Sequence, residues 1–204
     1  CNLPSLLKSM LKDRKSQFVD RLGWPLKVSS GQYELDEYDR SDALYIICSD
    51  GADKHLGSMR LLPTNTANMI KDHFSNVIPG ITFATEKVWE CTRLCKSPHA
   101  SLKVSVSVLS AAAKLMQELN LQAFLGVFDS RAQRTYRRLG ATPMILGSKT
   151  IESDPISVGL WQFDRTIYSH LVSSSMYAFS EYDDMYHRSN NRQKLNESRE
   201  LENA

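Results

Sequence analysis

The sequence has 204 residues, of which 42% are hydrophobic and 24% are charged, and its formal net charge is +2. This length fits one domain that buries a core without disulfide or metal staples, and the small net charge argues against nucleic acid as a partner. No stretch of about 18 apolar residues predicts a membrane span and no leader resembles a secretory signal, so we expect a cytoplasmic protein without membrane association.

The cysteines and histidines give no metal-binding pattern. The four cysteines include no CxxC pair, and the five histidines are scattered along the chain. Cys48 and Cys91 lie in apolar, strand-like runs, which is typical of reduced and buried thiols. We therefore expect neither disulfides nor a metal site. Because the sequence begins with Cys1 rather than Met, we expect further residues to precede it.

The first part of the chain alternates between a helix and a polar stretch. Apolar residues at helical spacing predict a helix over residues 5–19, and Arg14 shares the apolar stripe, which directs its side chain toward the interior or its rim. Gly23-Trp24-Pro25 ends this helix. The polar residues 27–40 are expected to form a long ordered loop.

The remainder predicts a sheet with helices between some of its strands. A short helical segment is expected through residues 69–74, the clearest helix runs over 102–119, and Asp129 can cap another that Gly140 ends. We predict six strands, at 43–48, 56–62, from Val88, 121–127, near 142–146 and 158–163.

This order predicts a mixed α/β (α+β) fold with a mostly antiparallel sheet and flanking helices, and it is similar to the order of the Gcn5-related N-acyltransferase fold. We expect one domain over residues 1–180. Residues 181–204 contain six acids and four bases, a composition typical of a polar tail that forms a frayed helix or is disordered.

Charged residues fall where the patterns predict the interior. An isolated buried charge costs several kcal/mol, so such residues need partners. Two interpretations stay open, an ion-pair network that holds the loop to the sheet and a functional site. Glu90 and Arg93 are three apart and face opposite ways on a flat strand, so we expect a β-bulge between them. Periodicity places three bases on or near the interior, and three acids lie in an ordered loop or a strand near them: Arg14, Arg60 and Arg93, and Asp36, Asp39 and Glu90.

These residues carry a family resemblance. The pattern Arg14-x3-Phe18-x5-Trp24, Asp36-x2-Asp39, Gly57-x2-Arg60-Leu61-Leu62-Pro63-Thr64 and Trp89-Glu90-x2-Arg93 resembles the acyl-homoserine-lactone synthases, the LuxI-type autoinducer synthases of bacterial quorum sensing. The resemblance implies transfer of an acyl chain from acyl-acyl carrier protein to the amine of S-adenosylmethionine. Lactonisation and release of methylthioadenosine would follow, with S-adenosylmethionine as a substrate and no prosthetic group.

The resemblance also implies roles for individual residues. Glu90 is the candidate general base, acting through a water, with Arg93 beside it. The S-adenosylmethionine site would comprise Arg14, Phe18, Trp24, Asp36, Asp39 and Arg60. The acyl pocket would comprise Met69, Phe74, Val88, Leu125 and Val127. Carrier protein would dock on Arg131, Arg134, Arg138 and Lys149. Without the resemblance, Phe18 and the acyl-pocket residues read as ordinary core and the arginines as a solvated helix face.

Some positions depart from the family pattern. The usual Glu-x-Ser-Arg-Phe is here Glu90-Cys91-Thr92-Arg93-Leu94, which keeps a hydroxyl and an apolar side chain. Phe128 stands where many members that use 3-oxo acyl chains have threonines, which favours a chain without that group. The junction at residues 96–101 contains no glycine, unlike the pyrophosphate-binding turn of acetyl-CoA N-acetyltransferases.

Two alternatives to a carrier-protein-dependent synthase stay open. One is an acyl-CoA-dependent N-acyltransferase of the same fold, and the other is a non-catalytic module that binds S-adenosylmethionine or an acyl carrier. In each case we expect a monomer.

Overall fold

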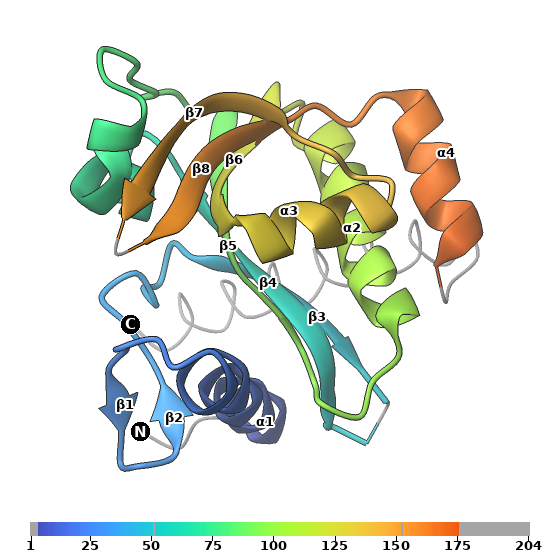
Figure 1. Ribbon diagram of the computed structural model, residues 1–204. Helices are drawn as coiled ribbons and strands as arrows, with labels where there is room; N and C mark the ends of the chain where they lie inside the picture. Colours follow the sequence, from blue (N-terminus) through green and yellow to red (C-terminus); the bar gives the residue numbers. More distant parts are fainter. Residues whose placement is uncertain (1–3, 51, 152, 176–204) are drawn as a thin grey trace, which may run out of the picture.

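The computed structural model describes residues 4–50, 52–151 and 153–175. Its centre is a six-stranded sheet in the order β3-β4-β5-β6-β8-β7 (Figure 1). Only the β5–β6 pair is parallel, which confirms the predicted mixed, mostly antiparallel sheet. The strands are β3 (Leu44–Ser49), β4 (His55–Pro63), β5 (Val88–Lys96), β6 (Ala123–Asp129), β7 (Met144–Ile151) and β8 (Asp154–Trp161).

Helices cover both faces of the sheet (Figure 1). The first face carries α2 (Leu102–Glu118), α3 (Ser130–Arg138) and α4 (Arg165–Ser174), which enclose the larger apolar core with Leu61, Phe124 and Trp161. The second face carries α1 (Ser5–Arg14) with its π-helical continuation η1 (Lys15–Arg21), and the short turns η2 (Ile70–Phe74) and η3 (Ser75–Val77).

A smaller group of apolar residues packs beneath η2 and η3. We call it the second apolar cluster, and it consists of Ile70, Val77, Ile78, Val88, Ala123, Leu125 and Val158. Its strand members lie on β5, β6 and β8, where odd-numbered β6 residues face this cluster and even-numbered ones face the larger core.

The N-terminal region differs from the prediction in two ways. The first helix runs on as η1 to Arg21 before Gly23 adopts a positive φ of 71°. The stretch expected to be a loop contains a small hairpin of β1 (Val28–Ser29) and β2 (Tyr33–Glu34). Three residues, 30–32, connect the two strands. Ser30 and Gly31 both take positive φ there, and the Gln32 amide donates to the Ser29 carbonyl at 3.1 Å to close the turn.

Local signals elsewhere were confirmed. The Asp129 side chain accepts a hydrogen bond of 2.7 Å from the Ala132 amide and so caps α3, and Gly140 has a φ of +74° after the end of that helix. No helix in the described ranges combines the length and the hydrophobicity that crossing a bilayer requires. The predicted tail over 181–204 and the predicted domain boundary at residue 180 lie outside the described residues.

The expected β-bulge is present in β5. Ser58 pairs with Cys95 and Arg60 pairs with Thr92, so three residue steps along β5 lie opposite two steps along β4. Arg93 lies within this stretch at a φ of +54°, a left-handed conformation that costs a non-glycine residue roughly 1–2 kcal/mol. The bulge turns the Arg93 side chain toward the same polar cluster that Thr92 and Arg60 reach.

Candidate active site

Six buried or half-buried charges meet where α1, β2, β4 and β5 converge. They form what we call the ion cluster, with three guanidinium groups and three carboxylates: Arg14, Arg60, Arg93, Glu34, Asp36 and Asp39. Their formal charges cancel, which meets the requirement that buried ions be paired.

The pairs in the ion cluster are close and mostly bidentate. Arg14 donates from Nε to Glu34 at 2.6 Å and from both terminal nitrogens to Asp39 at 2.8 and 3.0 Å. The two terminal nitrogens of Arg60 donate to the two carboxylate oxygens of Asp36. Burial opposes ionisation of Asp39, but the hydrogen bonds and charge of Arg14 outweigh it and hold the pKa of that carboxyl well below its usual range.

Arg93 completes the ion cluster from the bulge in β5. Its Nη2 lies 2.7 Å from Asp36 and 3.1 Å from Glu34. The Asp36–Asp39 turn is itself fixed, because the Asp36 amide donates to Asp39 at 2.8 Å and the Tyr38 amide donates to Asp36 at 2.9 Å. The cluster therefore joins the N-terminal region to the sheet through directional contacts rather than packing alone.

Glu90 lies beside the ion cluster but binds differently. Its side chain is fully buried, and its two oxygens accept hydrogen bonds from the amides of Met69 at 3.0 Å and Ile70 at 2.7 Å, at the start of η2. Burial raises the pKa of Glu90 to about 7, although those amides and the charge of Arg60 oppose the rise. A carboxyl group with a pKa near neutrality is suited to accept and release a proton.

Glu34 is the member of the ion cluster that the sequence analysis did not predict. The predicted cluster paired three arginines with Asp36, Asp39 and Glu90, and the structure replaces Glu90 with Glu34 as the third acid. The side chain of Glu34 is completely buried and contacts both Arg14 and Arg93. No local pattern marks Glu34, because a two-residue strand is too short to show alternation. The three acids already predicted also matched the three arginines in number, so the count of charges did not indicate a further acid.

The two predicted aromatic residues stack on each other. The Phe18 and Trp24 rings have centroids 5.1 Å apart and an interplanar angle of 14°. The guanidinium of Arg93 lies 5.7 Å from the Phe18 centroid, a cation–π distance. Phe18 is buried, whereas Trp24 is 40% exposed, so the pair extends from the ion cluster to the surface.

Four of the five predicted acyl-pocket residues lie together. Val88 and Leu125 belong to the second apolar cluster, and Phe74 and Val127 pack against it. Met69 does not share this position, because its sulfur lies 3.6–3.8 Å from nitrogens of Arg93 and Arg60. Met69 thus borders the ion cluster.

Phe128 occupies the opposite face of the sheet from the second apolar cluster. Its ring packs edge-on against Tyr136 and Trp161 in the larger core. Neighbouring strand residues face opposite ways, so Val127 and not Phe128 faces the second apolar cluster. The preference for an acyl chain without a 3-oxo group stays a prediction.

The predicted docking residues are exposed. Arg131, Arg134 and Arg138 lie on α3 together with Arg137, and Lys149 is exposed on the edge strand β7. Within the described part of the chain, no carboxylate forms an ion pair with any of the four α3 arginines. A helix with four unpaired cations and no acid presents a strongly positive surface.

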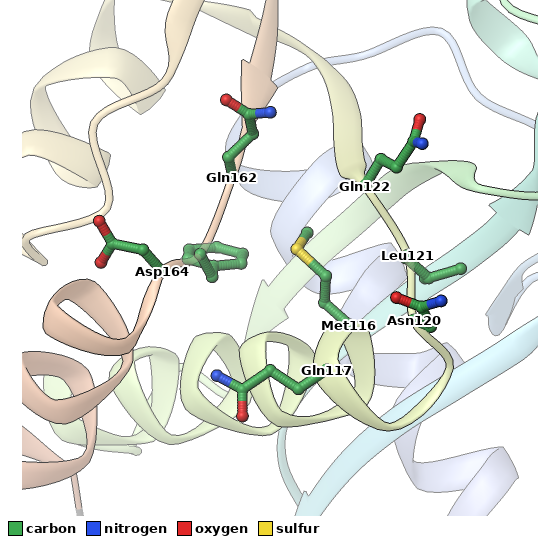
Figure 2. A pocket seen from close by; sticks show the side chains of 8 residues that line it. Met116, Gln117, Asn120, Leu121, Gln122, Gln162 and Asp164 are labelled. Atoms are coloured by element: carbon green, nitrogen blue, oxygen red, sulfur yellow. The ribbon is translucent and has the colours of Figure 1, made fainter.

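One surface pocket lies away from this site. The end of α2, the start of β6 and the junction of β8 with α4 enclose it (Figure 2), and its lining residues are Met116, Gln117, Asn120, Leu121, Gln122, Gln162, Phe163 and Asp164. It contains none of the charged side chains described above, so the convergent charges and not this hollow define the candidate site. In the described ranges, no group of three or more His, Cys, Asp or Glu side chains is arranged to hold a metal ion.

Comparisons with known proteins agree with this geometry. The family model described as "Autoinducer synthase" matches residues 3–159. An acyl-homoserine-lactone synthase from Rhizobium etli is 35% identical over 159 residues, which cover 74% of each chain.

Solved structures share the fold. BjaI, described as a CoA-dependent acyl-homoserine lactone synthase with S-adenosylmethionine and isopentyl-CoA, has a TM-score of 0.73 at 17% identity, covering 82% of this chain and 81% of BjaI. An N-acetyltransferase structure from Lactobacillus plantarum has a TM-score of 0.54 at 16% identity, covering 78% and 92%. The predicted N-acyltransferase-like fold is thereby confirmed, and the chain belongs to the autoinducer synthase family.

Proposed function

We propose that this protein is an acyl-homoserine-lactone synthase that makes a quorum-sensing signal from S-adenosylmethionine and an acyl thioester. Family membership supports the reaction class. The observation that supports this site as the place of the reaction is the environment of Glu90. Its buried carboxyl group has a pKa of about 7 and lies between the ion cluster and the second apolar cluster.

The charge of the candidate site complements S-adenosylmethionine. This substrate carries a sulfonium, an ammonium and a carboxylate, so its net charge is positive. The ion cluster is neutral as a set, and Glu90 adds one negative charge when it is ionised. Guanidinium groups of Arg14, Arg60 or Arg93 would meet the substrate carboxylate, and Trp24 would cover the sulfonium or adenine through its exposed ring face.

Two bond-forming steps then follow. The amine, once deprotonated by Glu90 through a water, attacks the thioester carbonyl, and the thiol leaves as the amide forms. The carboxylate oxygen next attacks the carbon beside the sulfonium, the carbon–sulfur bond breaks, and its electron pair neutralises the sulfur of the departing methylthioadenosine. The second apolar cluster, including Val88 and Leu125, would hold the acyl chain.

The central test is turnover with defined substrates. Purified protein is incubated with S-adenosylmethionine and a panel of acyl-acyl carrier proteins and acyl-CoAs, and methylthioadenosine and lactone are measured. We expect both products in equal amounts. Absence of methylthioadenosine with every donor would contradict the proposal and favour a non-catalytic binding module.

The role of Glu90 is tested by Glu90→Gln, which keeps the size of the side chain and one of its two acceptor oxygens but cannot accept a proton. We expect kcat to fall about 10²–10⁴-fold while S-adenosylmethionine still binds. Glu86→Gln, an exposed carboxylate just before β5, is the matched control and should retain full activity. Near-normal turnover of Glu90→Gln would assign Glu90 a structural role.

Acyl carrier protein is the proposed acyl donor, and the positive surface of α3 supports it. Carrier proteins are acidic, and the four α3 arginines have no acidic partner among the described residues. Near the start of α2, the Lys96 ammonium binds the carbonyls of Ser97 and Ala100 at 2.8 and 2.7 Å. That junction is therefore organised around a cation rather than around free amides for a CoA pyrophosphate.

The rival donor is acyl-CoA, which BjaI is described as using. Reversing charge with Arg134→Glu and Arg138→Glu should raise KM for the carrier-bound substrate by about ten-fold or more and change KM for acyl-CoA little. Arg165→Glu on α4, also exposed, controls for net charge. Equal effects of the α3 substitutions on both donors would reject docking at α3.

A further inference from the structure

Helix α1 carries a stripe of polar side chains toward the β3–β4 hairpin. Ser5, Ser9 and Asp13 recur every four residues and therefore share one side of the helix. Ser5 donates to Asp53 at 2.6 Å, and Ser9 accepts from the backbone amide of His55 at 3.1 Å. Asp13 Oδ2 lies 2.7 Å from His55 Nδ1. Two of the three contacts of this stripe are therefore made with one residue, His55.

His55 is fully buried and both of its ring nitrogens are engaged. Its Nε2 lies 2.9 Å from Ser58 Oγ, also on β4. The order Asp13–His55–Ser58 has the connectivity of a hydrolytic triad. Ser58 is only 1% exposed, however, so its hydroxyl cannot reach a substrate carbonyl, and this set serves another purpose.

The stripe lies immediately beside residues of the candidate active site. Asp13 precedes Arg14, whose guanidinium holds Glu34 and Asp39, and Phe18 follows one turn later in η1. Consecutive residues of a helix point about 100° apart, so Asp13 meets β4 while Arg14 meets the ion cluster. A shift of α1 along its axis would move both groups together.

Packing alone does not fix that axial position. Met10 and Leu11 bury the apolar side of α1, but apolar contact is non-directional and tolerates sliding. The hydrogen bonds to His55 are directional and short, and Asp13 stands one residue from the position that must be exact for substrate binding.

We propose that His55 is a positioning residue that sets the placement of α1, and through it Arg14 and Phe18, for binding S-adenosylmethionine. This inference rests on the proposed assignment of the ion cluster to that substrate. The His55 ring acts through Asp13, whereas Ser9 contacts the backbone amide of the same residue, a contact that substitution of His55 leaves in place. Loss of the ring should therefore weaken the binding of one substrate selectively.

The test compares steady-state kinetics and calorimetric binding of S-adenosylmethionine for wild type, His55→Ala and Asp13→Ala. We expect KM and Kd for S-adenosylmethionine to rise about ten-fold in both variants, with KM for the acyl donor changed less than about two-fold. His55→Asn keeps a donor near the Nδ1 position and should recover most of the affinity. Asp13 is partly exposed, so Asp13→Ala is informative if His55→Ala fails to fold.

Leu171→Ala is the matched control for loss of stability. Leu171 is fully buried in α4, within the larger core on the other face of the sheet. It should lower the melting temperature and leave both KM values unchanged. Unchanged S-adenosylmethionine affinity in Asp13→Ala, or equal rises in both KM values, would overturn the role of His55. If wild type itself bound no S-adenosylmethionine, the assignment of the ion cluster would fail, and the role of His55 with it.

Discussion

Two halves of one sheet face differ in how they are held together. On the β3–β4–β5 half, the contacts are ion pairs and hydrogen bonds among Arg14, Glu34, Asp39, Arg60 and their neighbours. On the β5–β6–β8 half, the second apolar cluster packs beneath η2 and η3 through apolar side chains. The ion pairs and hydrogen bonds of the first half depend on direction, whereas the apolar contacts of the second half do not.

The boundary between these halves lies within β5. Val88 belongs to the apolar half, Thr92 contacts Arg60 of the polar half, and Glu90 stands between them on the same side of the strand. A polar amino-acid substrate and an acyl chain would each find its complement on one half. Their reacting atoms would then meet beside Glu90, where a proton must be removed.

The largest effect should come from removing Glu34, because both Arg14 and Arg93 would lose a buried partner. We expect Glu34→Ala to lower the free energy of unfolding by about 3–5 kcal/mol and to abolish S-adenosylmethionine binding. Urea denaturation measures the loss. Glu37→Ala, whose side chain is 69% exposed, should cost almost nothing, and an equally small loss at Glu34 would show that the polar half is not stabilised by its ion pairs.

The pH dependence of stability should come next in size. The pKa of Glu90 is raised from 4.5 to about 7, so between these values the folded protein holds a proton that the unfolded chain has released. Stability should therefore fall as pH rises through this window, by about 3 kcal/mol at most. Asp39 titrates below this window, because the pKa of its carboxyl is depressed.

Glu90→Gln should remove this component of the pH dependence. Denaturation of wild type and variant at pH 5 and pH 8 gives the difference directly. The same ionisation should appear in catalysis, with kcat/KM of wild type rising up to about pH 7 and then levelling. Parallel losses of stability in wild type and Glu90→Gln between the two pH values would contradict the burial of an ionisable Glu90.

The sequence predicted part of the polar half and missed another part of it. Periodicity placed Arg14 inside, and the three-residue spacing of Glu90 and Arg93 required the bulge that the structure contains. Glu34 was not predicted because its partners lie 20 and 59 residues away in the sequence. Short-range patterns do not reveal pairs at such separations. Phe128 faces the larger core while its neighbour Val127 faces the second apolar cluster, because a one-residue change of position on a strand reverses the direction of the side chain.

An intermediate effect is expected in the apolar half. Val88 is 6% exposed within the second apolar cluster, and Val88→Ala should lower stability by about 2 kcal/mol. It should also raise KM for the acyl donor and leave KM for S-adenosylmethionine unchanged. Val108→Ala in the larger core, where Val108 is 1% exposed, should cost similar stability with neither KM affected. If both variants changed KM for the acyl donor equally, the second apolar cluster would not be the site that binds the acyl chain.

The smallest effect should come from a contact that crosses between the halves. The Tyr38 hydroxyl, in the turn that holds Asp36 and Asp39, donates to Asp72 of η2 at 2.9 Å, and η2 begins at the amides that bind Glu90. Tyr38→Phe should lower stability by about 1 kcal/mol, whereas Tyr33→Phe in β2 should not. A double-mutant cycle of Tyr38→Phe with Asp72→Ala isolates the coupling. A coupling near zero would mean that the polar half and η2 are held to β5 independently, so that Glu90 depends only on its own backbone contacts for its position.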